Sequence, residues 1–299
     1  ITDTPASAQP AMLLTGDFVF VGDIGRPDLL EQAAGLKGTQ EIGAEQMFDS
    51  LSQFAKLPDY IQVWPGHGAG SACGKALGAV PMTTVGYEKI RNWAVKLLGD
   101  KEAFKKELLS DQPEPPKYFA MMKKLNKVDR KLVTEVPSFK HLEQSEWQKA
   151  IKTETHIIDT RHFQKYAQGY WPGSINIANT SAFSTYMGWL IPYDQPFILI
   201  GEENEMEDMA RKLMRIGLDN HLGYITPEDL HQWEKNQLES YQPVSFNEVK
   251  KAADTKTAEV IDVRGISDYK INHIPGAHHL FYGTIQAHLN QVPSDQPVI

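Results

Sequence analysis

Three side chains near the start of the chain are candidates for metal binding or sulfur chemistry: Asp17, His67 and Cys73. Asp17 follows an apolar run that ends in Thr15-Gly16, and His67 follows a second run that ends in Pro65-Gly66. A carboxylate and an imidazole at strand ends, next to glycines that give a ligand room to approach, are typical of a metal site. Two ligands are not a complete site, and aspartate is also a common turn residue. The residues by themselves therefore leave a metal-binding and a turn-forming role open for Asp17.

Cys73 is the only cysteine in the chain. Free cysteines are commonly buried and inert. Cys73, however, lies in a run of small residues six positions after His67, with Lys75 close by. A nearby cation lowers the pKa of a thiol and makes the thiolate available. Cys73 is therefore a candidate catalytic thiol, with an inert buried cysteine as the alternative. A single cysteine also excludes an intramolecular disulfide and is typical of a reducing compartment, so we expect a cytoplasmic protein.

The composition of the 299-residue chain is that of a globular protein, with 41% hydrophobic and 23% charged residues. Its length favours two or three domains rather than one core. The 38 acidic residues outnumber the 30 basic ones, and the net charge of −8 argues against a nucleic-acid surface. No apolar stretch reaches the roughly 20 residues of a membrane helix. We therefore expect neither nucleic acid nor a membrane as a partner, and the oligomeric state stays open, with a homo-oligomer as one option.

An internal repeat organises the second half of the chain. In the first copy Asp159 precedes Gly173 by 14 positions, and in the second copy Asp262 precedes Gly276 by 14 positions, so the two copies are offset by 103. The short stretches 194–197 and 295–298 also match, at an offset of 101. Two matches in the same order indicate a duplicated structural unit.

Each copy has the pattern of a β-α-β unit. A short apolar run, Ile157-Ile158 or Val260-Ile261, predicts a buried strand, and a polar helical stretch and a Pro-Gly turn follow. The first copy continues with a predicted strand over 196–200 and a predicted helix over 205–215. Alternating strands and helices with short apolar strands favour a parallel, doubly wound sheet.

Residues 1 to about 125 have a different character. Strands are predicted at 12–14, 18–21 and 60–64, and an amphipathic helix at 44–54. The apolar spacing of Ile90, Trp93, Ala94 and Leu97 predicts a second helix. The proline-rich stretch 111–116 is expected to be a loop. We expect domains at 1–126, 135–238 and 243–299, and the absence of an initiator Met together with the apolar final residues suggests a fragment cut at both ends.

The motifs around Asp17 resemble a known family. Thr15-Gly16-Asp17, the stretch 25–29 (GRPDL) and the stretch 65–68 (PGHG) are similar to the second half of a metallo-β-lactamase-fold domain, in the branch of glyoxalase II and the persulfide dioxygenases. The stretch 66–74 resembles the bacterial persulfide dioxygenases that are fused to rhodanese domains, and 83–88 and 116–119 fit that subfamily. The two repeats resemble rhodanese modules.

The fold that this resemblance implies is α/β throughout. We expect the C-terminal half of a metallo-β-lactamase αββα sandwich, followed by two rhodanese-like doubly wound α/β modules, of which the second is incomplete. The family's cofactor is a mononuclear non-haem Fe(II) held by two histidines and one aspartate, and only the aspartate, Asp17, matches a position here. The resemblance places the remaining ligands before Ile1.

The resemblance also assigns roles to the neighbours of Asp17. His67 matches the position that completes a second metal site in the hydrolases and that lines the pocket without binding iron in the dioxygenases. Arg26 and Asp28 are expected to form a scaffold ion pair, because an Arg fork matches a carboxylate bidentately, or to orient the metal ligand from behind.

The rhodanese active site is a loop directly after a strand, in which a cysteine carries the transferred sulfur and backbone N–H groups hold the persulfide anion. In the first copy Gly201 occupies the cysteine position, and the acidic residues Glu202, Glu203 and Glu205 follow. An acidic loop repels a sulfur anion, so we expect this copy to be a pseudo-rhodanese. The loop of the second copy is expected after Ile299.

The function implied is an iron-dependent persulfide dioxygenase that oxidises a low-molecular-weight thiol persulfide to sulfite, coupled to a rhodanese sulfurtransferase that makes thiosulfate. The expected partners are thus a thiol persulfide and sulfite. Two alternatives stay open: a glyoxalase II-like thioester hydrolase with a dinuclear metal site, and a non-enzymatic sulfur-carrier scaffold.

Overall fold

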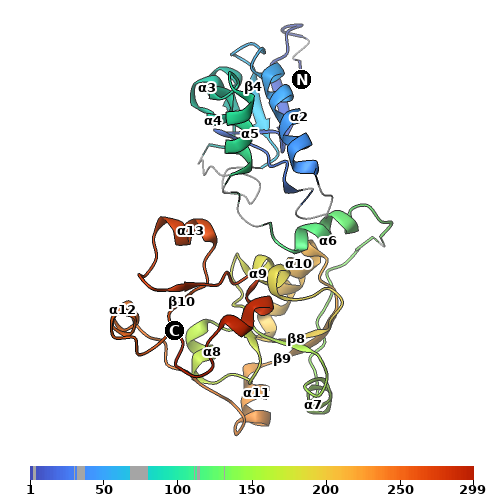
Figure 1. Ribbon diagram of the computed structural model, residues 1–299. Coiled ribbons are helices and arrows are strands. Elements are labelled where there is room, and N and C mark those ends of the chain that lie inside the picture. Colours follow the sequence, from blue (N-terminus) through green and yellow to red (C-terminus); the bar gives the residue numbers. More distant parts are fainter. Residues whose placement is uncertain are drawn as a thin grey trace. The chain divides into compact units, whose positions relative to one another are not determined.

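The computed structural model of the protein describes residues 1–2, 5–29, 31, 38–67, 80–110, 112, 115–130 and 132–299 (Figure 1). The chain divides into two compact units, Ile1–Pro115 and Pro116–Ile299. Cys73 and Lys75 lie outside the described residues. Among the described residues, no helix combines the length and apolar character needed to cross a bilayer.

The first unit is built on a short mixed sheet. Strand β1 (Met12–Gly16) runs parallel to β4 (Gln62–Pro65), which pairs antiparallel with β5 (Thr83–Thr84). Between β1 and the first long helix, β2 (Val19–Phe20) and β3 (Asp23–Ile24) form a small antiparallel hairpin. The helices are α2 (Thr39–Phe54), α3 (Val85–Arg91), α4 (Trp93–Lys96) and α5 (Lys101–Leu109). Their apolar faces meet in one core that includes Val19, Leu51, Val63 and Phe104.

The prediction of one helix near residues 90–97 is wrong in one respect, because the structure has two helices that meet at Asn92. The backbone of Asn92 is extended (φ −69°, ψ 121°), and its side chain accepts a hydrogen bond from the Ala94 N–H, so it caps α4. The Asn92 amide also donates to Asp23 O and to the Glu88 carboxylate. Apolar spacing is preserved across the break, and a spacing pattern does not contain the long-range bond from Asn92 to Asp23 O.

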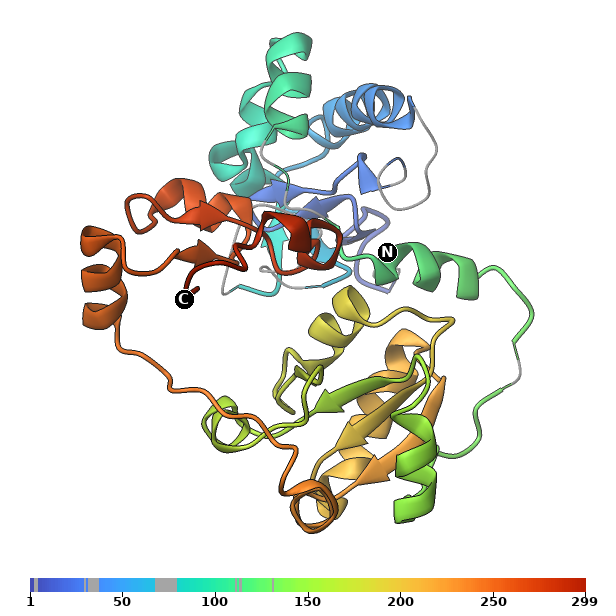
Figure 2. The same cartoon turned by 60° about the horizontal axis from the view of Figure 1, so that its bottom comes forward.

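The second unit begins with a four-stranded parallel sheet in the order β7-β6-β8-β9. Its strands are β6 (His156–Asp159), β7 (Ile175–Asn176), β8 (Phe197–Ile200) and β9 (His221–Ile225). The helices are α7 (Gln144–Ala150), α8 (Phe163–Gln168), α9 (Phe183–Leu190), α10 (Met206–Ile216) and α11 (Pro227–Glu234). Figure 2 shows the strands of this sheet side by side. We call this part the first module.

Both faces of this sheet are buried, as its apolar strands predict. Successive residues of a strand point to opposite faces, so Phe197 and Leu199 enter the core formed with α9 and α10. Ile198 and Ile200 enter the core formed with α7 and α11. Figure 1 shows these two helix pairs on opposite sides of β8 and β9. The predicted doubly wound α/β architecture is confirmed.

Helix α6 (Tyr118–Leu125) belongs to the second unit. Tyr118 and Met122 pack against the core shared by α9 and α10. The contact is close at Gly188 on α9, where an added Cβ would lie 2.3 Å from the Tyr118 ring. The structure therefore groups residues 116–126 with the second unit, whereas the sequence grouped them with the first.

The remaining residues form a second module with the same layout. It contains α12 (Phe246–Thr255), β10 (Ile261–Asp262), α13 (Ile266–Ile271), β11 (His278–His279) and a 3₁₀ segment over Ile285–Gln291. Strands β10 and β11 pair in parallel with Ile261 opposite His278, and in the first module Ile158 is opposite Ile175. A parallel bridge from Glu259 to Val298 corresponds to the first module's pairing of His156 with Phe197.

The two modules also share an ion pair at the end of the first strand. In the first module Arg161 grips the Asp159 carboxylate through Nε and Nη2 and donates to Gly169 O at 2.7 Å. In the second, Arg264 grips Asp262 in the same way and donates to Asn272 O at 2.7 Å. The pair therefore ties the strand end to the loop behind the following helix in both copies.

Burial separates these two pairs, which leads to a prediction. The Asp159 and Arg161 side chains are 0% and 13% exposed, and those of Asp262 and Arg264 are 9% and 49% exposed. Asp159→Asn leaves a buried guanidinium without its counter-charge, so we expect it to destabilise the first module by about 3 kcal/mol. Asp262→Asn should cost the second module clearly less, because water can solvate Arg264. Hydrogen exchange measured on peptides that cover β6 and β10 compares the two losses. Equal losses of stability in the two modules would contradict the larger contribution expected from the buried Asp159–Arg161 pair.

Candidate functional site

Asp17 and His67 lie together at one edge of the first unit's sheet. Asp17 follows β1 and His67 follows β4, and the carboxyl ends of parallel strands meet at the same edge. The distance from His67 Nε2 to Asp17 Oδ1 is 3.2 Å. The Asp17 side chain is 73% exposed and that of His67 is 33% exposed, so a ligand can reach the carboxylate from solvent.

Two glycines allow the backbone to approach Asp17 this closely. Gly66 N–H donates to Gly16 O at 2.8 Å, and a Cβ at Gly66 would lie 3.3 Å from Asp17 Oδ1. A Cβ at Gly25 would lie 1.9 Å from Asp17 O, a distance that no side chain can occupy. Any larger residue at position 25 must therefore displace the backbone that carries the carboxylate.

The imidazole of His67 is held by an aromatic neighbour. Its ring stacks on Phe20 at a centroid distance of 4.6 Å and an interplanar angle of 26°. Phe20 is 4% exposed and belongs to β2, so the ring is fixed by the β2–β3 hairpin. The contact sets the plane of the imidazole next to the carboxylate.

Arg26 and Asp28 form a bidentate ion pair directly after Gly25. Arg26 Nε donates to Asp28 Oδ1 at 3.1 Å and Nη2 donates to Oδ2 at 2.8 Å. The two side chains are 0% and 2% exposed. A planar fork on a carboxylate fixes the local chain in one shape, and here it does so beside the residue that packs on Asp17.

The donors that this edge offers to a metal are one carboxylate and one imidazole. Both Fe(II) and Zn(II) accept these donors. Among the described residues, no group of three or more His, Cys, Asp and Glu side chains could hold a metal ion. The donor chemistry of Asp17 and His67 is therefore compatible with a metal centre, of which these two side chains would be an incomplete ligand set.

The loop after β8 in the first module leaves no room for a side chain at Gly201. An added Cβ would lie 2.3 Å from Thr160 Oγ1 and 3.1 Å from Met206 Cε. The Thr160 hydroxyl is itself held, because it donates to Ile200 O at 2.9 Å. Sequence reasoning singled out Gly201 but missed Thr160. The one signal was the contrast of Asp-Thr-Arg in the first copy with Asp-Val-Arg in the second.

The acidic residues after Gly201 continue into the first turn of α10. Glu202–Glu205 form a tight turn, and Glu207 and Asp208 follow on the helix. Arg211 Nη2 lies 2.6 Å from Glu207 Oε1, and Lys212 Nζ lies 2.7 Å from Asp208 Oδ2. The hydrogen bond from Lys212 lowers the pKa of Asp208, so this carboxylate stays ionised to a lower pH than an ordinary aspartate. Acidic side chains thus occupy the helix end that would otherwise favour an anion.

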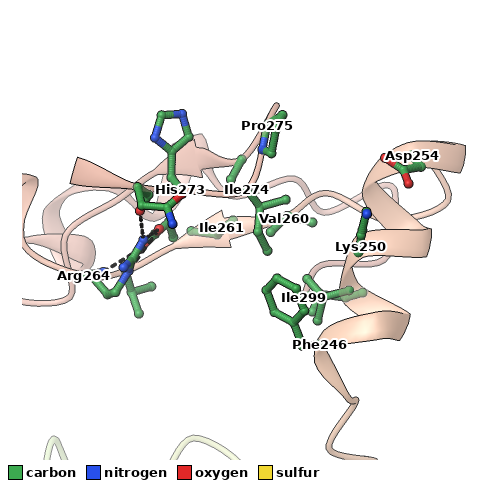
Figure 3. Close-up of a pocket in the computed structure, with 15 residues that line it drawn as sticks. Phe246, Lys250, Asp254, Val260, Ile261, Arg264, His273, Ile274, Pro275 and Ile299 are labelled. Atoms are coloured by element: carbon green, nitrogen blue, oxygen red, sulfur yellow. Dashed lines mark hydrogen bonds and ion pairs between the residues drawn. The ribbon is translucent and has the colours of Figure 1, made fainter. Parts of the chain in front are cut away.

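An apolar pocket of about 680 Å³ lies in the second module (Figure 3). Phe246, Val249, Val260 and Ile299 are among its lining residues, and Figure 3 shows Phe246 beside Ile299. By the repeat offsets of 103 and 101, Val260 and Ile299 correspond to two buried core residues of the first module, Ile157 and Ile198. Alignment of the capping boxes that begin α7 at Glu143 and α12 at Ser245 pairs Val249 with a third, Trp147. The pocket is therefore the second module's equivalent of a core face and not a catalytic cleft.

The packing at Gly201 generates a prediction. Gly201→Cys should destabilise the first module by about 1–3 kcal/mol, because the new Cβ overlaps a hydroxyl that is already bonded. Thr160→Ala should relieve much of that loss in the double variant, and thermal unfolding of the two single variants and the double variant measures the coupling. Gly265→Cys is the matched control, since nothing lies within 4 Å of a Cβ there. Strong sulfur transfer from thiosulfate to cyanide by Gly201→Cys alone would contradict the conclusion that the loop has no room for a side chain at position 201.

Comparison with known proteins places both halves of the chain. Residues 143–236 and 245–298 match the rhodanese-like domain family. A crystal structure of a metallo-β-lactamase from Staphylococcus aureus is 44% identical, covers 76% of this chain and superimposes with a TM-score of 0.66. The match covers 62% of the staphylococcal chain, so this chain spans less than two thirds of that protein's length.

Two further solved structures match more weakly. A 3-mercaptopyruvate sulfotransferase from Escherichia coli is 20% identical over 52% of this chain and 84% of that chain, with a TM-score of 0.26. A thiosulfate sulfurtransferase from Pseudomonas aeruginosa is 14% identical over 95% of this chain and 56% of that chain, with a TM-score of 0.29. Scores this low support no structural argument. No curated protein gives a significant match.

These matches agree with the structure. Strands β1 and β4 share the edge that carries Asp17 and His67, and the β-α-β module is duplicated. The chain is a metallo-β-lactamase–rhodanese fusion, with two rhodanese-like domains after the metallo-β-lactamase-like part.

Proposed function

We propose that the protein is a persulfide dioxygenase coupled to a rhodanese sulfurtransferase. A low-molecular-weight thiol persulfide, O₂ and water would give the free thiol and sulfite. Sulfite would then accept the outer sulfur of a second persulfide, which gives thiosulfate and another free thiol. Both steps balance in atoms and electrons, with O₂ as the oxidant of the first.

One observation carries the proposal: a carboxylate–imidazole pair at a metallo-β-lactamase sheet edge occurs in one chain with two sulfurtransferase-like modules. Sulfur-relay modules are useful next to an enzyme that releases a sulfur anion. Covalent linkage raises the effective concentration of sulfite at the acceptor module, since the product need not diffuse through bulk solution.

In this proposal Asp17 is one ligand of a mononuclear Fe(II). The metal would supply open positions at which O₂ and the persulfide sulfur meet. Asp17 presents an exposed carboxylate for binding, and Gly25 and Gly66 keep its backbone in place. Phe20 orients His67 beside it, and the Arg26–Asp28 pair fixes the following loop.

A thioester hydrolase with two metals is the second candidate, and a specific observation favours it. The 3.2 Å contact between His67 Nε2 and Asp17 Oδ1 brings a histidine next to a carboxylate that could bridge two metals. Metal analysis separates the candidates: one iron per chain supports the dioxygenase, and two zinc-like ions support the hydrolase. The rhodanese-like domains weigh against the hydrolase, because thioester cleavage releases no sulfur for transfer.

A non-enzymatic sulfur-carrier scaffold is the third candidate, and the first module is the part that favours it. Its loop is closed at Gly201 by Thr160 and is acidic beyond that point. Oxygen uptake in the presence of a thiol persulfide decides between scaffold and enzyme, because a scaffold consumes no O₂.

The role of Asp17 gives a prediction with a matched control. Asp17→Ala should remove iron binding and persulfide-dependent O₂ uptake, by more than the roughly 10–100-fold that loss of an outer-shell partner costs. Asp59→Ala changes a carboxylate in the same unit with the same 73% exposure and should keep both properties. Metal content and circular dichroism are measured alongside activity. Iron at wild-type stoichiometry in folded Asp17→Ala would refute the assignment.

The proposed role of Cys73 is tested by its reactivity, since the residue lies outside the described part of the chain. A thiol that handles sulfur beside the metal pocket should be alkylated in the folded protein at neutral pH, with a rate profile shifted below the ordinary thiol pKa of about 8.5. The unfolded protein provides the reference rate. A thiol that stays inert up to a pH of about 9 would assign Cys73 to the inert buried class.

A further inference from the structure

The carboxylate of Glu88 is fully buried in the first unit, although it belongs to no site described above. Glu88 lies on α3 and is 0% exposed. Its Oε2 accepts hydrogen bonds from Gly22 N–H and Asn92 Nδ2, each at 2.8 Å, and its Oε1 accepts one from Thr83 Oγ1 at 2.8 Å. These three donors are neutral groups. Loss of any of these hydrogen bonds leaves a buried carboxylate partly unsatisfied, which costs a large amount of folding free energy.

Two of the groups in this network hold the same turn. Gly22 is the second of the two residues between β2 and β3, and its backbone has a left-handed φ of 81°. Glu88 binds its N–H, and Asn92 donates to the next carbonyl, Asp23 O, at 3.0 Å. Trp93 Nε1 donates to the Asp23 carboxylate at 2.7 Å. The start of α4 and the end of α3 therefore clamp the tip of the hairpin.

The same hairpin also carries the residues that contact the site. Phe20 pairs with Asp23 across the two strands and stacks on His67. At the base, Gly25 N–H donates to Phe18 O at 2.9 Å, and Gly25 packs against Asp17 O. The hairpin is only two residue pairs long, so a shift at its tip is transmitted to both Phe20 and the Asp17 backbone.

We propose that Glu88 is a positioning residue for the Asp17–His67 pair, acting through the β2–β3 hairpin. Its carboxylate, held by Thr83 and Asn92, accepts from Gly22 N–H and fixes the turn, the turn fixes Phe20, and Phe20 fixes the His67 ring. The consequence for metal binding rests on the proposed function, whereas the consequence for the His67 ring does not.

The two variants Glu88→Gln and Glu88→Ala separate this role from the charge of the residue. In Glu88→Gln the amide oxygen can accept from Gly22 and Asn92, and the amide nitrogen can donate to Thr83, whose hydroxyl can act as an acceptor. The clamp is therefore kept without the negative charge. Glu88→Ala removes all three bonds. Glu88→Asp keeps the charge but is one methylene too short to reach all three donors.

The readout is the ring-proton resonance of His67 in the full chain with labelled histidine. The measurement is made at a pH of about 8.5, where an ordinary imidazole is neutral. Loss of one signal in His67→Gln assigns the resonance. Phe20→Leu, which removes the stacking ring, gives the unstacked reference value. Leu108→Ala is the matched control, because it truncates a 0%-exposed residue of α5 in the same unit and makes none of the clamp contacts.

The expected result is that Glu88→Gln and Leu108→Ala keep the wild-type resonance. Glu88→Ala should move it more than half of the way to the Phe20→Leu value, and Glu88→Asp should move it in the same direction by less. Glu88→Asp carries the test if Glu88→Ala fails to fold. A wild-type resonance in folded Glu88→Ala or Glu88→Asp overturns the proposal, and so does an equal displacement in Leu108→Ala.

Iron titration of the same variants separates this inference from the proposed function. Weaker iron binding in Glu88→Ala than in Glu88→Gln supports a role of the hairpin in positioning the proposed ligand Asp17. If wild-type protein binds no iron while the resonance still moves in Glu88→Ala, the proposed function fails and the positioning role stands. If iron binds equally to wild type and Glu88→Ala and the resonance is unchanged, the positioning role fails and the proposed function is unaffected.

Discussion

Parallel pairing of neighbouring strands is the constraint on which both units of the chain depend. In a parallel pair the two carboxyl ends lie at one edge, so residues far apart in sequence are brought together where their strands end. The β1–β4 pair does this for Asp17 and His67. The β6–β8 pair does it for Thr160 and Gly201. One pairing rule therefore produces an open edge with an exposed carboxylate in the first unit and a closed edge in the second.

The buried carboxylates of the chain are satisfied in two ways, with different consequences. Asp28 and Asp159 each accept an arginine fork, which matches the charge and the shape of the carboxylate at once. Glu88 has three neutral donors around it. A fork fixes the local chain between two neighbouring residues, whereas distributed donors join segments that are far apart in sequence. The arginine forks fix the shape of loops, and the donors around Glu88 hold a hairpin against a helix.

The sequence predicted the features that depend on local patterns and on the repeat. The apolar pairs Ile157-Ile158 and Val260-Ile261 predicted buried strands, and the offset of 103 predicted two modules of one layout, which the strand registers confirm. The doubly wound class followed from the alternation of strands and helices.

Features that depend on contacts distant in sequence could not be predicted. At the helix break, Asn92 and Trp93 donate to Asp23, about 70 residues earlier, and no spacing rule contains these bonds. The packing of α6 on Gly188 is equally invisible, since it needs the fold to bring the two together. At the candidate site, the residues Asp17 and His67 were identifiable by type, but their separation and the role of Phe20 required the structure.

The close contact between Gly201 and Thr160 has a consequence for how the first module can change over generations. A glycine at position 201 permits a hydroxyl at position 160, and that hydroxyl then excludes any side chain at 201. The two positions are epistatic, because the effect of a substitution at one depends on the residue at the other. If the hydroxyl at position 160 is lost first, the hydrogen bond to Ile200 O is lost with it. If a side chain is introduced at position 201 first, it overlaps the Thr160 hydroxyl. The structure thus opposes a stepwise gain of a side chain at position 201, because either order of substitution passes through a less stable intermediate.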